Sequence, residues 1–179
     1  NDEENKVIKQ FNLLSSKPTF YIGNISESEN SSKELSKLKE IANELDSFVI
    51  PASIKIEQQI SLLKEDEKNE YLELMGMDEP VLNKIIFEGY KMLGLKTFFT
   101  AGPNEIRAWT IKDGFLAPNA AGVIHTDFER GFIKAEVIDF DDFIESKGEL
   151  GAKEKGKLRL EGKDYLVKDG DVIHFKFNV

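Results

Sequence analysis

The residues best suited to chemistry near the start of the chain directly follow an apolar segment. Residues 19–22, Thr-Phe-Tyr-Ile, are β-branched and aromatic, which predicts a strand, and the sequence continues Gly-Asn24-Ile25-Ser26-Glu27. An Asn amide donates and accepts hydrogen bonds and a carboxylate accepts them, so Asn24 and Glu27 could recognise the edge of a purine base. Asn24-Ile25-Ser26 also matches an N-glycosylation sequon, and the segment could instead be a polar turn before a helix. These residues alone leave the three interpretations open.

A second apolar segment supports the base-binding interpretation. Residues 48–51 are Phe-Val-Ile-Pro, and Ala52-Ser53 follow them. Between the two apolar segments, residues recur at helical spacing: Leu35, Leu38, Ile41 and Leu45. Strand, turn, helix and strand in this order predict a βαβ unit with parallel strands. Because open α/β sheets bind ligands beyond the carboxyl ends of their strands, Ser53 should lie beside Asn24 and Glu27.

The remaining chain predicts helices followed by a small mixed sheet. Apolar positions at helical spacing predict helices over 56–63, 64–74 and about 81–93. After Gly94, short β-rich runs between turn signals predict strands over 97–100, 106–111, 132–138, 158–160, 165–167 and 172–177. One helix is predicted over 120–128. The character of the sequence changes near residues 93–96, which predicts a domain boundary there.

The composition narrows the classes of protein that this chain could represent. A net charge of −9 argues against nucleic-acid binding over the whole surface, so any phosphate contact needs a local cationic patch. No apolar run approaches the roughly 20 residues that cross a bilayer, and we predict no membrane contact. The absence of cysteine excludes thiolate metal sites, and two histidines are too few for a multi-His site, so we predict no metal site. These features favour a reducing, cytoplasmic location.

One stretch of this acidic chain is cationic. It contains Lys153, Lys155, Lys157, Arg159 and Lys163. Lysines at the edge of a hairpin protect it against aggregation, and the same side chains could contact the phosphates of ribosomal or other RNA. Both interpretations stay open. Glutamates within the same stretch reduce its net positive charge.

Three further groups have simpler interpretations. His125 and His174 are single and far apart in sequence, so we expect structural or hydrogen-bonding roles for them. Trp109 could stack on a base, but its position in an apolar β-rich run favours a place in the core. Residues 139–145 resemble a calcium loop without its turn glycine and full spacing, so we expect a solvated corner between a strand and a helix.

Four segments carry a resemblance to a known family. They are KPTFYIGNISE, LNKIIFEGYKMLGLKTFFTAGPNEIRAWTI, APNAAGVIHTDFERGFIKAEVI and GKLRLEGKDYLVKDGDVIHFKFNV. From Lys17 to Val179 the chain closely resembles the Obg-like ATPases of the YchF type, a translation-associated branch of the Obg family of P-loop NTPases. The second half is the most specific part, since AAGVIHTDFERGFI followed by a DGDVIHFKFNV ending is hard to reach by chance.

The resemblance implies an α/β then α+β fold. Residues 1–16 would end a coiled-coil insertion, 17–92 would form the closing βαβ part of a P-loop G-type nucleotide-binding domain, and 93–179 would form a ubiquitin-like β-grasp TGS domain. Asn24, Ile25 and Glu27 would lie on the loop that reads the base, with Ser53 on the loop behind it. Asn-Ile-Ser-Glu replaces a box that usually ends in Asp and reads guanine, and the resemblance implies a family that accepts ATP as well as or better than GTP, in keeping with this change.

The sequence departs from the family in its phosphate-handling residues. It contains no G-x-x-x-x-G-K-[ST] loop and no matching Mg²⁺-holding Asp-x-x-Gly segment. Because phosphoryl transfer depends on that loop and Mg²⁺, we predict that this chain alone is catalytically inactive and holds no nucleotide firmly. The intact protein is expected to hydrolyse ATP or GTP with Mg²⁺ and to bind the ribosome or its RNA, without DNA specificity. The alternative is a non-enzymatic module that binds RNA or protein through the TGS domain.

Overall fold

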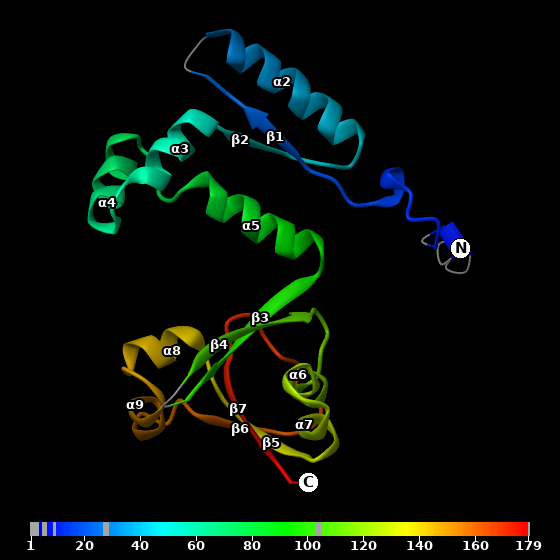
Figure 1. The fold of residues 1–179 in the computed structure, drawn as a ribbon, viewed down its shortest axis with the longest axis vertical. Coiled ribbons are helices and arrows are strands. Elements are labelled where there is room, and N and C mark those ends of the chain that lie inside the picture. Colours follow the sequence, from blue (N-terminus) through cyan, green and yellow to red (C-terminus); the bar gives the residue numbers. More distant parts are fainter. Residues whose placement is uncertain (1–3, 5–6, 9, 27–28, 103–104, 179) are drawn as a thin grey trace. The chain divides into compact units, whose positions relative to one another are not determined.

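The computed structural model describes residues 4, 7–8, 10–26, 29–102 and 105–178, and the chain divides into two compact units, Asn1–Gly89 and Tyr90–Val179 (Figure 1). The division lies inside helix α5, Val81–Met92. The predicted boundary between residues 92 and 93, and the identities of the parts, stay predictions. No helix among the described residues is long and apolar enough to cross a membrane.

The first unit contains a parallel βαβ arrangement, which confirms that prediction. After a 3-10 helix η1, Leu14–Ser16, strand β1, Tyr21–Asn24, pairs in parallel with β2, Val49–Ala52. Helix α2, Glu29–Glu44, connects them (Figure 1). Strand β1 runs two residues beyond the predicted end at Ile22, because Gly23 and Asn24 pair with Pro51 and Ala52. The sequence prediction ended the strand two residues too early because the residues after Ile22 are those of a polar turn.

Gly23 allows helix α2 to lie close to the two strands. A Cβ atom at this buried position would lie 2.8 Å from Leu35 Cδ1 and 3.2 Å from Val49 Cγ1. The first distance is shorter than real Cβ contacts. Glycine at this point therefore sets how closely helix and sheet pack, just before the strand ends at Asn24.

Three further helices follow β2: α3, Ile54–Leu62; α4, Glu65–Leu74; and α5. The Glu57 side chain, in the first turn of α3, accepts hydrogen bonds from Val81 N at 2.8 Å and Leu82 N at 3.2 Å. This carboxylate satisfies backbone donors that the first turn of a helix leaves without internal partners. Glu57 therefore fixes where α5 begins relative to α3.

The second unit is built on a five-stranded mixed sheet in the order β4-β3-β7-β5-β6. Its strands are β3, Leu95–Ala101; β4, Ile106–Lys112; β5, Phe132–Ile138; β6, Arg159–Glu161; and β7, Val172–Phe177. Strands β3 and β7 pair in parallel, and the other pairs are antiparallel. The strand predicted over 165–167 is wrong, since this segment forms only one isolated bridge, between Leu116 and Leu166.

Helices cover the two faces of this sheet. Helices α6, Ala117–Ile124, and α7, Thr126–Arg130, lie on one side, and α8, Phe140–Glu145, and α9, Glu149–Glu154, lie on the other (Figure 1). Neighbouring residues of β3 show the alternation: Phe98 belongs to the core with the alanines of α6, while Phe99 contacts Phe140. The predicted helix 120–128 is divided at His125, whose backbone is extended.

Candidate functional site

The predicted base-contacting residues lie where β1 and β2 end. Asn24 is the last residue of β1 and pairs with Ala52, the last residue of β2. Ile25 N then donates to Ala52 O at 2.9 Å, which holds the two loops together beyond the strands. The structure thus brings Asn24, Ile25 and Ser53 to the same edge of the sheet. Glu27 lies outside the described residues.

The side chains of Asn24 and Ser53 organise this edge. Asn24 Oδ1 accepts from Ile54 N at 3.3 Å, so one side chain bridges the two loops. Ser53 is the N-cap of α3, and its Oγ accepts from Ile56 N at 3.5 Å. Asn24 is exposed, and with its oxygen engaged it offers amide N–H groups as donors. This edge could therefore hold a planar group that carries hydrogen-bond acceptors.

The cationic stretch does not form a single free patch. Lys155 Nζ donates to Glu145 O at 3.4 Å, and Lys157 Nζ lies 3.1 Å from Asp142 Oδ1. Lys153 and Lys163 are exposed and have no ion-pair partner among the described residues. Contacts within the chain therefore partly occupy Lys155 and Lys157, while Lys153 and Lys163 are available to contact a partner.

Arg159 belongs to a network inside the second unit. Its Nη2 lies 3.3 Å from Asp139 Oδ1 and 3.6 Å from Asp171 Oδ1. Asp171 is 1 % exposed, and its Oδ2 accepts from Tyr165 Oη at 2.8 Å and Lys168 N at 2.9 Å. Burial raises the pKa of Asp171, while the hydrogen bonds from Lys168 and Tyr165 oppose that shift. Burial, then the bond to Asp171, also raises the pKa of Tyr165.

The Lys-Asp-Gly-Asp turn attaches the end of the chain to β3. Asp169 Oδ1 accepts from Thr97 N at 2.7 Å, and Gly170 N donates to Thr97 O at 2.8 Å. Gly170 has a φ of +83°, a conformation that glycine adopts without strain. Asp171 O then accepts from Phe99 N at 2.8 Å. The Asp-Gly-Asp residues of the DGDVIHFKFNV segment therefore have a structural role, because they connect this turn to β3.

The other specific segment is also engaged in packing. Asn119 Nδ2 donates to Glu129 Oε1 at 3.1 Å, and a Cβ atom at Gly122 would lie 2.6 Å from Glu129 Oε2. His125 Nδ1 accepts from Asp127 N at 3.2 Å, as an N-cap of α7. These contacts agree with the structural role expected for His125.

Trp109 packs against the core of the second unit, as the sequence favoured. Its Nε1 donates to Thr100 Oγ1 at 2.9 Å, and Arg107 Cζ lies 4.1 Å from the centre of its ring. The predicted corner over 139–145 is also confirmed, since Asp139 is the N-cap of α8 directly after β5.

Sequence reasoning missed Asp139 and Asp171 as partners of Arg159 and Glu57 as the cap of α5. Asp139 is separated from Arg159 by α8 and α9, Glu57 is separated from α5 by α4, and Asp171 follows Arg159 across a long loop, so spacing along the chain gives no signal of these contacts. The strand order β7-β5-β6, once known, would have placed the partners of Arg159 near one another.

Comparison with known proteins identifies relatives over the whole chain. A family model described as "YchF-GTPase_C: Protein of unknown function" matches residues 95–178. "Ribosome-binding ATPase YchF" of Pasteurella multocida is 55% identical over 179 residues, which is 99% of this chain and 49% of that protein. "Obg-like ATPase 1" of Xenopus laevis is 49% identical, over 99% of this chain and 46% of that protein.

The chain is also similar to a solved structure over almost its whole length. The Schizosaccharomyces pombe YchF GTPase is 35% identical with a TM-score of 0.81, over 98% of this chain and 48% of that one. The chain therefore spans about half the length of the curated relatives it matches.

Proposed function

We propose that this chain works as the carboxyl-terminal part of a nucleotide hydrolase that binds the ribosome, because it is similar over 99% of its length to proteins named "Ribosome-binding ATPase YchF" and "Obg-like ATPase 1". The observation that carries this proposal is the common edge formed by Asn24, Ile25 and Ser53 at the ends of two parallel strands. Such an edge is where open α/β sheets bind nucleotides.

Base recognition is the role proposed for this edge. The Asn24 amide donates to an acceptor on the purine edge while its oxygen holds the second loop through Ile54 N. Glu27, in the same Asn-Ile-Ser-Glu sequence, accepts from an N–H donor on the base. Ile25 and Ser53 shape the loops on either side. The hydrogen-bonded connection between the loops supports this proposal, because it orders the site before ligand binds.

The phosphates and Mg²⁺ are assigned to residues outside this sequence. The 179 residues contain no phosphate loop, and their relatives are about twice as long. ATP or GTP with Mg²⁺ is therefore the proposed ligand of the intact protein, and this chain alone is expected to show no hydrolysis.

The second unit is proposed to be a TGS domain with the ubiquitin-like β-grasp fold, over residues 93–179. If its five strands are numbered 1 to 5 along the chain, from β3 to β7, their order across the sheet is 2-1-5-3-4. The first and last strands along the chain, β3 and β7, are parallel neighbours, and α6 lies between β4 and β5 along the chain. This arrangement supports the proposal. Residues 17–92 are correspondingly assigned to the closing part of a G-type domain, and 1–16 to the end of a coiled-coil insertion.

Nucleotide binding and turnover by the intact protein test the enzymatic proposal. Asn24→Ala should weaken ATP binding about tenfold, the equivalent of one hydrogen bond of about 1.4 kcal/mol. Asn69→Ala, an exposed asparagine on α4, is the matched control and should leave binding unchanged. Glu27→Asp should raise the preference for GTP over ATP. Equal losses in the Asn24 and Asn69 variants, or no turnover by the intact protein, would refute the proposal.

The ribosome is the proposed partner, in the cytoplasm, with contact to its RNA through Lys153 and Lys163. Double charge reversal of these two residues should reduce cosedimentation with ribosomes and lower the dependence of binding on salt. Reversal of Lys37 and Lys39 on α2 controls for net charge. Binding that residues 93–179 retain without any nucleotide dependence would favour a non-enzymatic RNA- or protein-binding module instead.

A further inference from the structure

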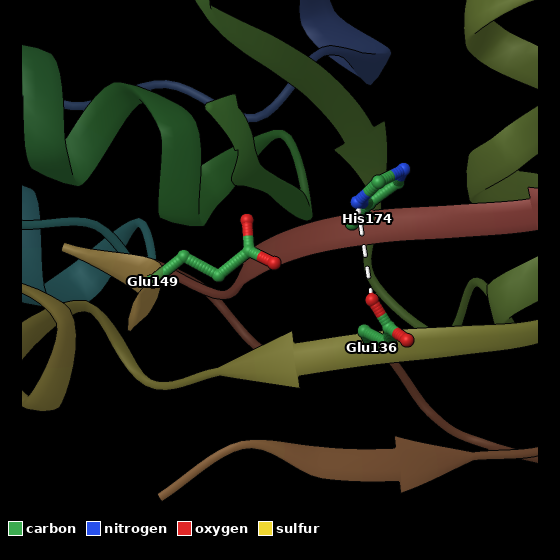
Figure 2. A group of neighbouring side chains, drawn as sticks. All are labelled: Glu136, Glu149 and His174. Atoms are coloured by element: carbon green, nitrogen blue, oxygen red, sulfur yellow. Dashed lines mark ion pairs between the residues drawn. The ribbon is translucent and has the colours of Figure 1, made fainter. Parts of the chain in front are cut away.

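Three side chains with metal-ligating atoms converge on the sheet of the second unit, on the face that α8 and α9 cover. Glu136 of β5 and His174 of β7 are direct neighbours in the antiparallel register, and Glu149 is the first residue of α9. One ligand atom from each residue lies within 4.8 Å of the others. Figure 2 shows Glu136 and His174 on adjacent strands, with Glu149 extending from the start of α9.

These side chains line a hollow with an apolar floor. The same hollow is bounded by Ala101, Ile138, Phe143, Leu158, Val172 and Ile173. Glu136 is the most enclosed of the three ligands, with 21 % of its side chain exposed, while 54 % of the His174 side chain is exposed. The hollow fixes one carboxylate against the sheet and leaves the imidazole and the second carboxylate free to adjust.

From this geometry we propose that Glu136, Glu149 and His174 bind a zinc ion. Imidazole nitrogen and carboxylate oxygen are both ordinary zinc ligands at about 2.0–2.2 Å, and three protein ligands leave a fourth position for water. Tetrahedral ligands at that distance lie about 3.4 Å apart. His174 Nδ1 and Glu136 Oε2 are 3.9 Å apart and the three ligand atoms all lie within 4.8 Å of one another, so side-chain rotations would have to bring them together around the ion. Two carboxylates neutralise the two charges of the ion.

Lys176 is the competing cation in this site. Its Nζ lies 3.3 Å from Glu136 Oε2 and 3.5 Å from His174 Nε2. The ammonium group contacts Glu136 through the oxygen nearest the imidazole, so zinc must displace it or use the other carboxylate oxygen. This competition weakens the site and gives a specific expectation: removal of the Lys176 charge tightens binding.

A bound ion would attach α9 to the sheet. Glu149 follows Gly148, whose φ is +114°, and α9 has only six residues. The ion would connect this short helix to β5 and β7, two strands that are remote from it in sequence. Occupancy should therefore stabilise the second unit, because a ligand that binds only the folded state raises its unfolding temperature.

Calorimetric titration of the full chain with ZnCl₂ tests the proposal. We expect one equivalent to bind with micromolar affinity, and a rise on the order of 5 °C in the unfolding temperature at saturating zinc. His174→Ala and Glu149→Gln should each weaken binding at least tenfold. His125→Ala, the other histidine of the chain, and Glu154→Gln, the last residue of α9, are the matched controls and should bind as the parent does.

Lys176→Met provides the decisive second variant, because it should tighten zinc binding several-fold while removing no ligand. The proposal is overturned if zinc shows no saturable binding in the micromolar range, if His125→Ala weakens it as much as His174→Ala, or if Lys176→Met leaves affinity unchanged. A loss of binding by Glu149→Gln together with a gain by Lys176→Met would establish the site without relying on any single substitution.

Discussion

Replacement of Tyr165 by Phe tests whether the buried carboxylate of Asp171 organises the second unit. The change removes the hydroxyl that donates to Asp171 Oδ2 at 2.8 Å and accepts from Arg159 Nη2 at 3.3 Å, and it leaves the packing of the ring intact. Asp171 Oδ1 already lacks a hydrogen-bond partner among the described residues, so only Lys168 N would remain as a hydrogen-bond donor to the carboxylate. Hydrogen bonds to charged groups contribute about 1.5–3 kcal/mol, and we expect a loss of about 2–3 kcal/mol in the free energy of unfolding.

Urea unfolding followed by tryptophan fluorescence measures this loss. Trp109 is the single tryptophan of the chain and packs against the core of the second unit, so its signal reports on that unit. Tyr90→Phe is the control, because the Tyr90 hydroxyl has no hydrogen-bond partner among the described residues, and it should change stability by less than about 0.5 kcal/mol.

A double-mutant cycle separates the hydrogen bond from other effects of the substitution. If the hydroxyl acts through the carboxylate, Tyr165→Phe should cost about 1 kcal/mol less when Asp171→Asn is already present, because the acceptor is then neutral. Strict additivity of the two substitutions, or a cost of Tyr165→Phe below about 0.5 kcal/mol, would refute the argument that Asp171 is held by Tyr165.

Three further outcomes follow from single contacts. Burial raises the pKa of Asp171 above its ordinary 3.8, so ionisation of this carboxyl group disfavours the folded state. The free energy of unfolding of the parent, relative to that of Asp171→Asn, should therefore fall as the pH rises from 3.8 through the raised pKa. Urea unfolding at each pH measures this difference. Gly23→Ala should cost about 1–3 kcal/mol because its Cβ meets a leucine methyl of α2 at 2.8 Å, whereas Gly89→Ala, open on α5, should be neutral or stabilising. Gly131→Ala should destabilise the second unit in thermal unfolding, since its Cβ would lie 2.2 Å from Asn178 O.

The strands of the second unit were largely predictable because their residues alternate between two environments. The predicted bounds 132–138 and 172–177 coincide with β5 and β7. Ala135, Val137, Ile173 and Phe175 face the core, and the polar residues Glu136 and His174 lie between them on the other face, which is the two-residue alternation of a strand. The segment 165–167 has the same composition, but Tyr165 and Val167 are used to reach the core and the Asp171 network from a loop. Composition alone cannot distinguish these two uses.

The candidate site likewise contains some features that the sequence predicts and others that it does not. The placement of Ser53 beside Asn24 was predictable, because parallel strands end at one edge and the βαβ spacing is visible in the sequence. The hydrogen bond from Ile54 N to Asn24 was not, since it depends on the loop conformation. For Arg159 the sequence prediction was incomplete, because the sequence reveals its positive charge but not the acidic side chains that pair with it. Its partners Asp139 and Asp171 become neighbours only through the sheet order.

The pairing of Arg159 changes how the cationic stretch can be tested. Reversal of its charge would place a carboxylate beside Asp139 and the buried Asp171, and the resulting repulsion would destabilise the fold whether or not Arg159 contacts RNA. Loss of ribosome binding in such a variant would therefore be uninformative. Lys153 and Lys163 lack ion-pair partners among the described residues, so their reversal removes charge without breaking a contact of the fold. The residues that stand out most in the sequence are thus used for internal structure, and exposed lysines without partners are the sound choice for mapping an RNA contact.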